Sequence, residues 1–339
     1  WAVMILINCV FLLIGDPFSL MTLEFILKLS LPVYLFLFLR VFITSRRDLD
    51  GLLTSFLLSG IFVAVLLLYE IVVRPISVQE SRGLERIQGS FGDVVSYGMY
   101  IVFTLIAATY FFVLHRKSGT GFPKTALVIA VGVLGFLGLL NIHHTATYTV
   151  FLLVLSLFVL QNFRSGSPVL AFLIIVAFGV VMDFAGSEII EEKITPLVQT
   201  DLMVYSGEAE SDRLLHGRVG RWRMMLNMFS QEPVWVQFFG YPLKFEYVFH
   251  FIGIGSHNDF VRMLFATGIA GLLAYLGFIG TVFRQLPKLT PHGRYLLLTA
   301  FLALILYSIS VTPTMYAPFM YFILSVFAFA ALPAEKFTA

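Results

Sequence analysis

Charged residues are scarce in this sequence. They make up 12% of its 339 residues, against roughly 25% in a typical soluble domain, whereas 59% of the residues are hydrophobic and 36 are Phe. A soluble core could not bury so much apolar surface, so this composition excludes an ordinary soluble protein and indicates a polytopic membrane protein. The net charge of +2 gives no reason to expect a nucleic-acid partner.

Cysteine is nearly absent as well. The single residue, Cys9, lies in an apolar run, which excludes an intrachain disulfide framework and a thiolate metal site. The chain opens at Trp1 within an apolar segment, with neither a Met nor a basic region before it. We therefore expect no signal peptide, and the start leaves open whether earlier residues or whole helices precede it.

Long apolar runs, by contrast, are abundant. A membrane-spanning helix needs about 20 mostly apolar residues, and about ten such runs can be drawn. They are continuous rather than alternating, so we predict an all-α polytopic membrane fold of about ten or more helices and not a barrel. The predicted spans are 1–14, 22–41, 52–73, 94–114, 125–140, 146–161, 168–184, 259–283, 294–312 and 315–332.

The basic residues between these runs predict the orientation. If the spans alternate, four basic loops and the C-terminal residues 334–339 fall on one side, which the positive-inside rule makes cytoplasmic. The basic residues of these loops are Arg40, Arg46, Arg47, Arg116, Lys117, Lys124, Arg164, Arg284, Lys288 and Arg294.

The opposite side receives one long segment. We divide the chain into N-terminal transmembrane helices (1–184), a periplasmic loop domain (185–257) and C-terminal transmembrane helices (258–339). Helical patterns in the loop domain occur around 187–200 and 217–230. Loops of this length are usually functional.

The stretch "SHND" stands where the loop domain meets the next apolar run. Ser256 followed by Asp259 fits a capping box, with Ser256 as the N-cap and His257 and Asn258 as the first two helical residues. The positive end of a helix disfavours imidazolium, so we expect a neutral His257 that can accept a proton. The N–H groups there could also face a diphosphate, although a polar helix cap at the membrane interface explains the same residues. Arg262 could snorkel outward or pair with Asp259.

The segment 214–229 predicts a helix with an arginine on its apolar face. Arg218, Trp222, Met225 and Phe229 fall on one stripe. Such an arginine needs an anion, which could be a carboxylate (Asp212 or Glu210) or a phosphate held by the guanidinium fork. Arg221 lies at the edge of the stripe, and we expect Arg223 to be solvated.

Other polar groups carry weaker signals. In the loop 74–92, Arg82 and Arg86 lie between Glu80 and Glu85, where solvated ion pairs are the ordinary explanation. His143 and His144 indicate a polar interface turn, because adjacent side chains point in different directions. The spacing of potential ligands gives a metal little support, with Asp16 as the one acid that such a site could use. Glycines at 268, 271, 277 and 280 predict close helix packing.

These elements together resemble those of a known family. His257-Asn258, nine residues and then Gly268-Ile269-Ala270-Gly271 reproduce the H-N-x9-G-x-x-G pattern of bacterial O-antigen ligases, which related polysaccharide polymerases and protein O-oligosaccharyltransferases share. "HGRVGRW" is similar to the family's G-R-x-x-x-W element, with Arg218 and Trp222 in its key positions, and residues 89–101 resemble a further family segment. The resemblance covers about residues 85–285.

The resemblance implies a membrane-embedded, GT-C-like fold and a metal-independent inverting glycosyltransferase without a cofactor. Its donor would be a glycan on undecaprenyl diphosphate, and its acceptor a hydroxyl of lipid A-core or of another glycan. The enzyme would be a multi-pass protein of the bacterial inner membrane with its active site facing the periplasm. The catalytic residues would be His257, as base, and Arg218. Substrate contacts would come from Arg221, Arg82, Arg86, Asn258 and Arg262.

One departure from the family concerns the helix that begins "TATYTVFLL". Many members have a Ser-Arg pair there, whereas this chain has Ala146-Thr147. The role of that arginine would have to pass to Arg82, Arg86 or Arg221. Two other classes stay open: a transporter or flippase of lipid-linked glycans, which would bind the diphosphate without forming a bond, and a non-catalytic assembly subunit.

Overall fold

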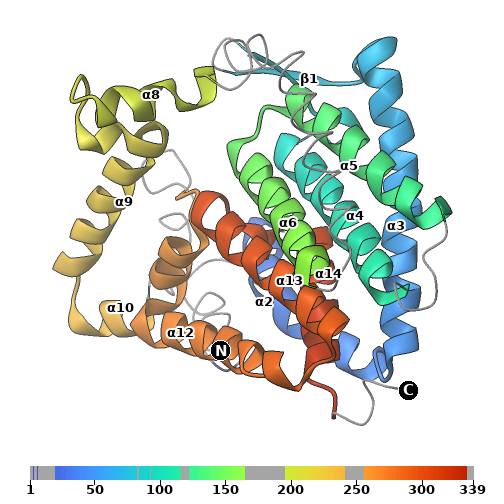
Figure 1. Cartoon of the computed structure of the whole chain (residues 1–339). Helices are drawn as coiled ribbons and strands as arrows, with labels where there is room; N and C mark the ends of the chain where they lie inside the picture. Colours follow the sequence, from blue (N-terminus) through green and yellow to red (C-terminus); the bar gives the residue numbers. More distant parts are fainter. Residues whose placement is uncertain are drawn as a thin grey trace. The chain divides into compact units, whose positions relative to one another are not determined.

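The structure is a computed structural model that describes residues 3, 6, 20–81, 84–91, 93–115, 122–164, 195–240 and 256–333. The predicted spans 1–14 (apart from residues 3 and 6) and 168–184, together with Asp16 and Arg82, lie outside these residues. The described chain is helical except for one hairpin (Figure 1). It forms two compact units, which take their residues from 1–44, 200–287 and 304–332, and from 45–199, 288–303 and 333–339.

Five of the described helices are long and apolar enough to cross a membrane. They are Arg46–Val72, Val94–Leu114, Thr145–Asn162, Asp259–Lys288 and Pro291–Ser310, and shorter apolar stretches cover Ser30–Phe42, Ile129–Ile142 and Ala317–Ala330. Each coincides with a predicted span, because a continuous apolar run can satisfy its backbone in lipid only as a helix. The chain is thus an all-α membrane protein in its described part.

The first unit contains α2, most of the loop-domain helices, and the C-terminal helices apart from most of α13. α14 (Ala317–Ala330) packs against α2 (Leu20–Phe42), and Arg40 at the end of α2 donates to the carbonyl of Ala328 at 3.3 Å. The other elements are α9 (Leu214–Gln231), α10 (Val234–Phe239), α12 (Asp259–Phe283), three 3₁₀ turns, the end of α13 (Pro291–Ser310) and most of α8 (Thr195–Tyr205). The 3₁₀ turns are η4 (Ser211–Arg213), η5 (Leu286–Lys288) and η6 (Pro313–Met315).

Two of these loop-domain helices bear on the predictions. The helix expected around 217–230 is confirmed as α9. The one expected around 187–200 begins, within the described chain, at Thr195 and continues to Tyr205.

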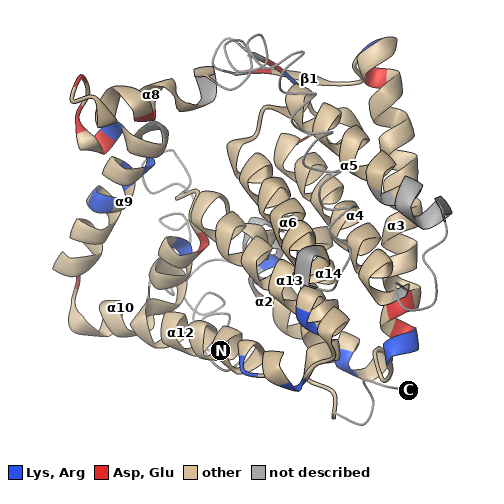
Figure 2. Ribbon diagram, viewed as in Figure 1, with Lys and Arg blue, Asp and Glu red and all other residues tan. Residues whose placement is uncertain are grey.

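The second unit is a helical bundle around α4. α4 (Val94–His115) packs against α3 (Arg46–Val72), α5 (Phe122–Ile142) and α6 (Thr145–Arg164). It is the most deeply buried candidate span, because it contacts three helices. Charged residues lie mostly near helix ends (Figure 2), as expected where helix centres face lipid. In this unit a capping box of Ser45 and Asp48 starts α3.

The loop 74–92 contains a hairpin that we did not expect. β1 (Val78–Ser81) pairs antiparallel with β2 (Leu84–Ile87), and η1 (Gly89–Phe91) follows. Two residues, Arg82 and Gly83, separate the strands, which is the loop length typical of tight hairpins.

Candidate functional site

A hydrogen bond joins the two elements on which the family resemblance rests. The indole Nε1 of Trp222, in α9, donates to the carbonyl of Ser256 at 2.7 Å. Ser256 directly precedes His257, and Arg218 lies one helical turn before Trp222. The segments around residues 218 and 257 therefore meet within the first unit, and that they form one site stays a prediction.

Further along α9, a cluster of apolar side chains packs this helix against α12. Met225, Phe229, Val261 and Phe265 form one buried cluster, and the rings of Phe229 and Phe265 lie 5.2 Å apart. The predicted stripe of α9 is confirmed, since Trp222 also packs on this cluster. Half-buried Arg218 continues the stripe at its polar end, and its Nη1 donates to Ser310 Oγ at 3.2 Å.

One of the two carboxylates considered as a partner of Arg218 forms an ion pair with a different arginine of α9. Asp212 forms an ion pair with Arg223, whose side chain is about half exposed. Arg223 is thus solvent-exposed, as expected, and it also forms an ion pair, which contributes little to stability because it is exposed. Arg221 is half-buried on α9.

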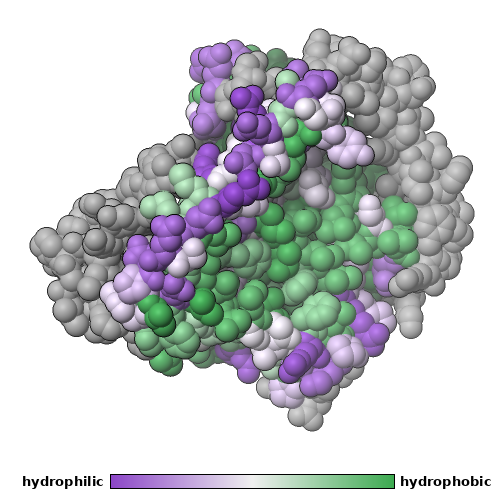
Figure 3. All heavy atoms as spheres, turned by 90° about the vertical axis from the view of Figure 1, so that its left-hand side faces the viewer, coloured by the Kyte–Doolittle hydropathy of each residue, from purple (hydrophilic) through white to green (hydrophobic). Residues whose placement is uncertain are grey.

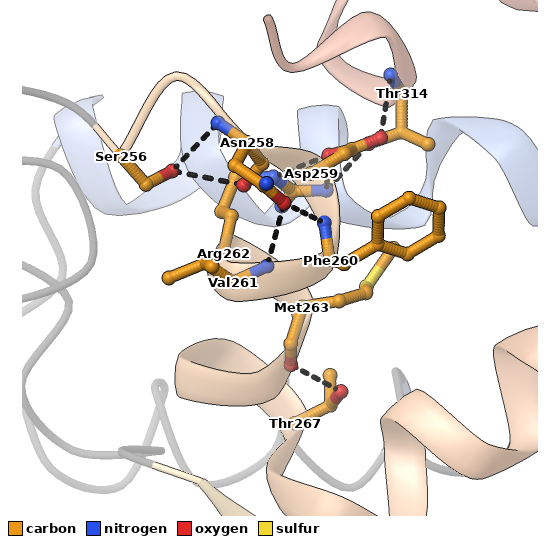
Figure 4. Close-up of polar contacts among 9 residues, drawn as sticks. All are labelled: Ser256, Asn258, Asp259, Phe260, Val261, Arg262, Met263, Thr267 and Thr314. Atoms are coloured by element: carbon orange, nitrogen blue, oxygen red, sulfur yellow. Dashed lines mark hydrogen bonds and ion pairs between the residues drawn. The ribbon is translucent and has the colours of Figure 1, made fainter. Parts of the chain in front are cut away.

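The N-cap of α12 is Asn258 and not Ser256. Asn258 is extended, and its Oδ1 accepts hydrogen bonds from the backbone N–H groups of Phe260 (2.9 Å) and Val261 (3.1 Å) (Figure 4). Ser256 Oγ instead donates to the carbonyl of Asn258 at 3.0 Å. The predicted capping box is wrong because the carboxylate of Asp259, which should close it, is engaged elsewhere.

His257 accordingly lies outside the helix. Its φ is 46°, a left-handed conformation that few non-glycine residues adopt, and its side chain is exposed. Such a conformation costs about 1–3 kcal/mol and persists only where the surroundings impose it. Here Asn258 on one side and the Trp222–Ser256 bond on the other hold the turn.

Asp259 forms a buried cluster with Arg262 and Thr314. Arg262 Nε lies 2.8 Å from Asp259 Oδ1, and Nη2 contacts both Asp259 and the hydroxyl of Thr314. Thr314 Oγ1 also donates to Asp259 Oδ1 at 2.7 Å, and its backbone N–H to Oδ2 at 3.2 Å (Figure 4). The three residues are 0%, 1% and 1% exposed, in the order Asp259, Arg262 and Thr314.

This cluster decides between the two alternatives for Arg262. It does not snorkel outward but pairs with Asp259, and the nitrogen Nη1 is buried without a hydrogen-bond partner among the described residues. A guanidinium closed off in this way has no surface to offer a substrate, so the expected substrate contact of Arg262 is not supported by this geometry. No sequence pattern pointed to Thr314, which lies in η6, 52 residues after Arg262.

Gly268 bends α12 where the predicted glycine pair begins. Its φ is 65° and its ψ −172°, a region that essentially only glycine occupies. A Cβ there would lie 2.3 Å from the carbonyl oxygen of Phe238, so the glycine allows the backbone of α10 to approach. The packing prediction is confirmed for Gly268, whereas no atom of the described residues lies within 4 Å of where a Cβ would stand at Gly277 or Gly280, for which close packing stays a prediction.

The remaining predicted residues lie in the second unit or outside the described chain. Arg86, on β2, is buried, so the expectation of a solvated ion pair is wrong for it. His143 and His144 form the turn between α5 and α6, as predicted, and both are buried.

Position 147, just after the same turn, is tightly packed. Thr147 is buried, its Oγ1 lies 2.7 Å from His144 Nδ1, and it packs directly against Gly98. An arginine at position 147 would have no room. Among the residues that the structure describes, no three His, Cys, Asp or Glu side chains gather as a metal site.

The fold and site thus define an all-α membrane protein with an exposed histidine next to an arginine- and tryptophan-bearing helix. No family model matches the chain, and no curated protein matches it.

Proposed function

We propose that this protein is a metal-independent inverting glycosyltransferase of the O-antigen ligase and polysaccharide polymerase type. The Trp222–Ser256 hydrogen bond carries the proposal, because it brings a candidate base, His257, beside a helix that presents Arg218. The donor would be a glycan on undecaprenyl diphosphate and the acceptor a hydroxyl of lipid A-core or of another glycan.

In this proposal the acceptor hydroxyl attacks the anomeric carbon of the donor. The new glycosidic C–O bond forms as the C–O bond to the diphosphate breaks, which inverts the configuration and releases undecaprenyl diphosphate. His257 takes the hydroxyl proton, as a general base. Its exposed side chain leaves it accessible to an acceptor.

Arg218 would stabilise the negative charge that develops on the departing diphosphate. A guanidinium fork suits phosphate oxygens, and a preorganised cation next to lipid acts at low dielectric. Arg218 is half-buried and donates to the hydroxyl of Ser310, so part of its guanidinium remains exposed to a phosphate group. A second cation would come from Arg221, on the same helix.

The other two polar residues receive supporting roles. Asn258, as the N-cap of α12, would shape the turn that carries His257. Arg262 would anchor the first turn of α12 through Asp259. We further propose that the whole protein has about ten or more spans in the bacterial inner membrane, with residues 185–257 and this site on the periplasmic side.

A product assay tests the proposal. Purified protein in nanodiscs would be incubated with an undecaprenyl-diphosphate glycan and lipid A-core in the presence of EDTA, and the products analysed by gel and mass spectrometry. We expect glycan on lipid A-core from a ligase, or a longer glycan still on undecaprenyl diphosphate from a polymerase. Donor binding without a new glycosidic bond would instead identify a transporter.

Two arginine variants make this assay specific for the site. Arg218→Ala should lower transfer roughly 10²–10³-fold, the usual effect of removing one preorganised donor. Arg223→Ala, on the same helix but in an exposed ion pair with Asp212, should transfer at nearly the parental rate. Equal activities of the two variants would remove Arg218 from the mechanism.

A further inference from the structure

The helix α9 changes character along its length. Its first ten residues carry Arg218, Arg221 and Arg223, whereas the second half exposes apolar side chains at Met224, Leu226 and Met228. On the face that carries α9, a hydrophilic band borders a hydrophobic area (Figure 3). In water, neighbouring exposed apolar residues are costly, and they usually mark a surface that contacts something apolar.

The apolar half of α9 runs alongside a membrane-spanning helix. Trp222 contacts Ser256, just before α12, and further along both helices the ring of Phe229 contacts that of Phe265 at a tilted angle. The two helices therefore advance in the same direction. Since α12 is one of the candidate membrane spans, the arginine-bearing end of α9 lies beside the start of that span, and the apolar half lies beside residues further into it.

The short helix α10 packs closely against α12, further from the start of that helix than the Trp222 contact. A Cβ on Gly240, at the end of α10, would lie 2.7 Å from the carbonyl oxygen of Phe265, and Gly268 of α12 meets Phe238 as closely. Gly268 is nine residues into α12, which is about 13 Å along the helix axis at 1.5 Å per residue. The position of α10 is thus tied to the interior part of a membrane span.

One face of α10 is apolar and open. We call this the α10 face; it consists of Val234 (80% exposed), Trp235 (54% exposed), Phe238 and Phe239. The opposite side of the helix packs inward through buried Val236. Large apolar side chains this exposed on a short helix need an apolar environment.

The turn between α9 and α10 satisfies its backbone internally. The side-chain amide of Gln237 donates to the carbonyls of Ser230 (3.0 Å) and Glu232 (2.7 Å). Irregular backbone is tolerated at membrane depth only when its polar groups find partners within the protein. Half-buried Glu232 at the same turn limits the depth, because a carboxylate is costly near the bilayer centre.

From these observations we propose that the C-terminal half of α9 and all of α10 lie within the bilayer, in the half of it where α12 begins. There the α10 face contacts lipid acyl chains. This assigns residues 224–239, which we expected in a water-exposed loop domain, to the membrane. The arginines of α9 then stand at the lipid–water boundary. The proposal rests on α12 as a membrane span and not on the proposed enzymatic function.

Spin labels in nanodiscs test this directly. In a Cys9→Ser background, Val234→Cys would be labelled and its collision rates with oxygen, which concentrates in lipid, and with a water-soluble nickel chelate would be compared. Phe62→Cys, exposed within the candidate span α3, and Tyr205→Cys, 93% exposed at the end of α8, are the lipid and water controls.

The proposal expects the Val234 label to behave like the Phe62 label, with frequent oxygen and rare nickel collisions. Nickel collisions as frequent as those of the Tyr205 label would overturn it, and so would an immobile label that neither reagent reaches, because protein would then cover the face. Should Val234→Cys not fold, emission quenching by brominated acyl chains serves instead. Since Trp1 and Trp222 also emit, quenching should decrease in Trp235→Phe rather than vanish, and quenching that persists unchanged would also refute the proposal.

Discussion

Two turns of this chain place a histidine at positive φ shortly before a long apolar helix. His143, at φ 50°, precedes α6, and His257, at φ 46°, precedes α12. His143 is 2% exposed and packed in the second unit, whereas the side chain of His257 is exposed and its turn is bonded to Trp222. Two histidines with the same backbone conformation therefore differ in environment: His143 is packed in the interior, whereas His257 is accessible from outside.

The supports of the two turns differ in strength. The first turn of α12 is held by a buried ion pair of Asp259 and Arg262, with Thr314 bridging them. At the start of α6, by contrast, the side chains of His144 and Thr147 are joined by a hydrogen bond. If an exposed His257 needs firm support from the residues around its turn, substitutions that remove the support of the α12 turn should lower the unfolding free energy more than a substitution at the α6 turn.

Breaking the ion pair should have the largest effect. Arg262→Met leaves Asp259 buried without its cation, and the loss of one partner of such a pair costs about 3–5 kcal/mol of unfolding free energy. The measurement is reversible unfolding in mixed micelles. The double variant Asp259→Asn/Arg262→Met should recover much of the loss, and a double variant as unstable as the single one would contradict this account.

The bend of α12 comes next. Gly268→Ala forces a Cβ into a backbone conformation that costs about 1–3 kcal/mol, and the new atom meets the Phe238 carbonyl. Gly277→Ala, in the same helix but with nothing within 4 Å, should be neutral or gain up to about 1 kcal/mol. The same unfolding titration compares them; equal stability of the two variants would mean that the bend is not required.

Removing the bond between α9 and the His257 turn should have a smaller effect on stability. Trp222→Phe keeps an aromatic ring but leaves the Ser256 carbonyl without its indole donor, at a cost of about 1–3 kcal/mol. A slight displacement of a catalytic group can slow a reaction up to about 10²-fold. We expect transfer to fall while donor affinity stays unchanged, and parental turnover in this variant would show that the bond does not position His257.

The α6 turn should respond least. Thr147→Val keeps the buried shape and removes only the hydroxyl bonded to His144, so the loss should be about 0.5–1.5 kcal/mol. Unfolding measures the change, and transfer should stay at the parental level. Loss of transfer in this variant would break the distinction between the two turns.

The sequence was sufficient for the helices but not for the contacts that assemble the site. A continuous apolar run can only be a helix in lipid, so 94–114 and 259–283 were predicted nearly as they occur. The N-cap could not be chosen from sequence, because Ser256 and Asn258 are both good caps. The choice depends on Asp259, whose carboxylate is taken by Thr314 from a distant turn.

The hairpin and the tryptophan bond illustrate two kinds of omission. Arg82 and Gly83 separate β1 from β2. A two-residue connection that contains glycine is a sequence signal for a hairpin, which our prediction did not use. The bond from Trp222 to Ser256 has no local signal, since 34 residues separate its ends. Only the packing of the α9 stripe on α12 brings them together.

The measurement that tests the central claim most directly is transfer by His257→Asn. The variant keeps a polar side chain at the turn and removes the base, so donor affinity should be unchanged while transfer to lipid A-core or glycan falls roughly 10²–10⁴-fold. His143→Asn, assayed beside it, should lose stability but not specific activity. Near-parental transfer by His257→Asn would show that this turn does not carry the catalytic base.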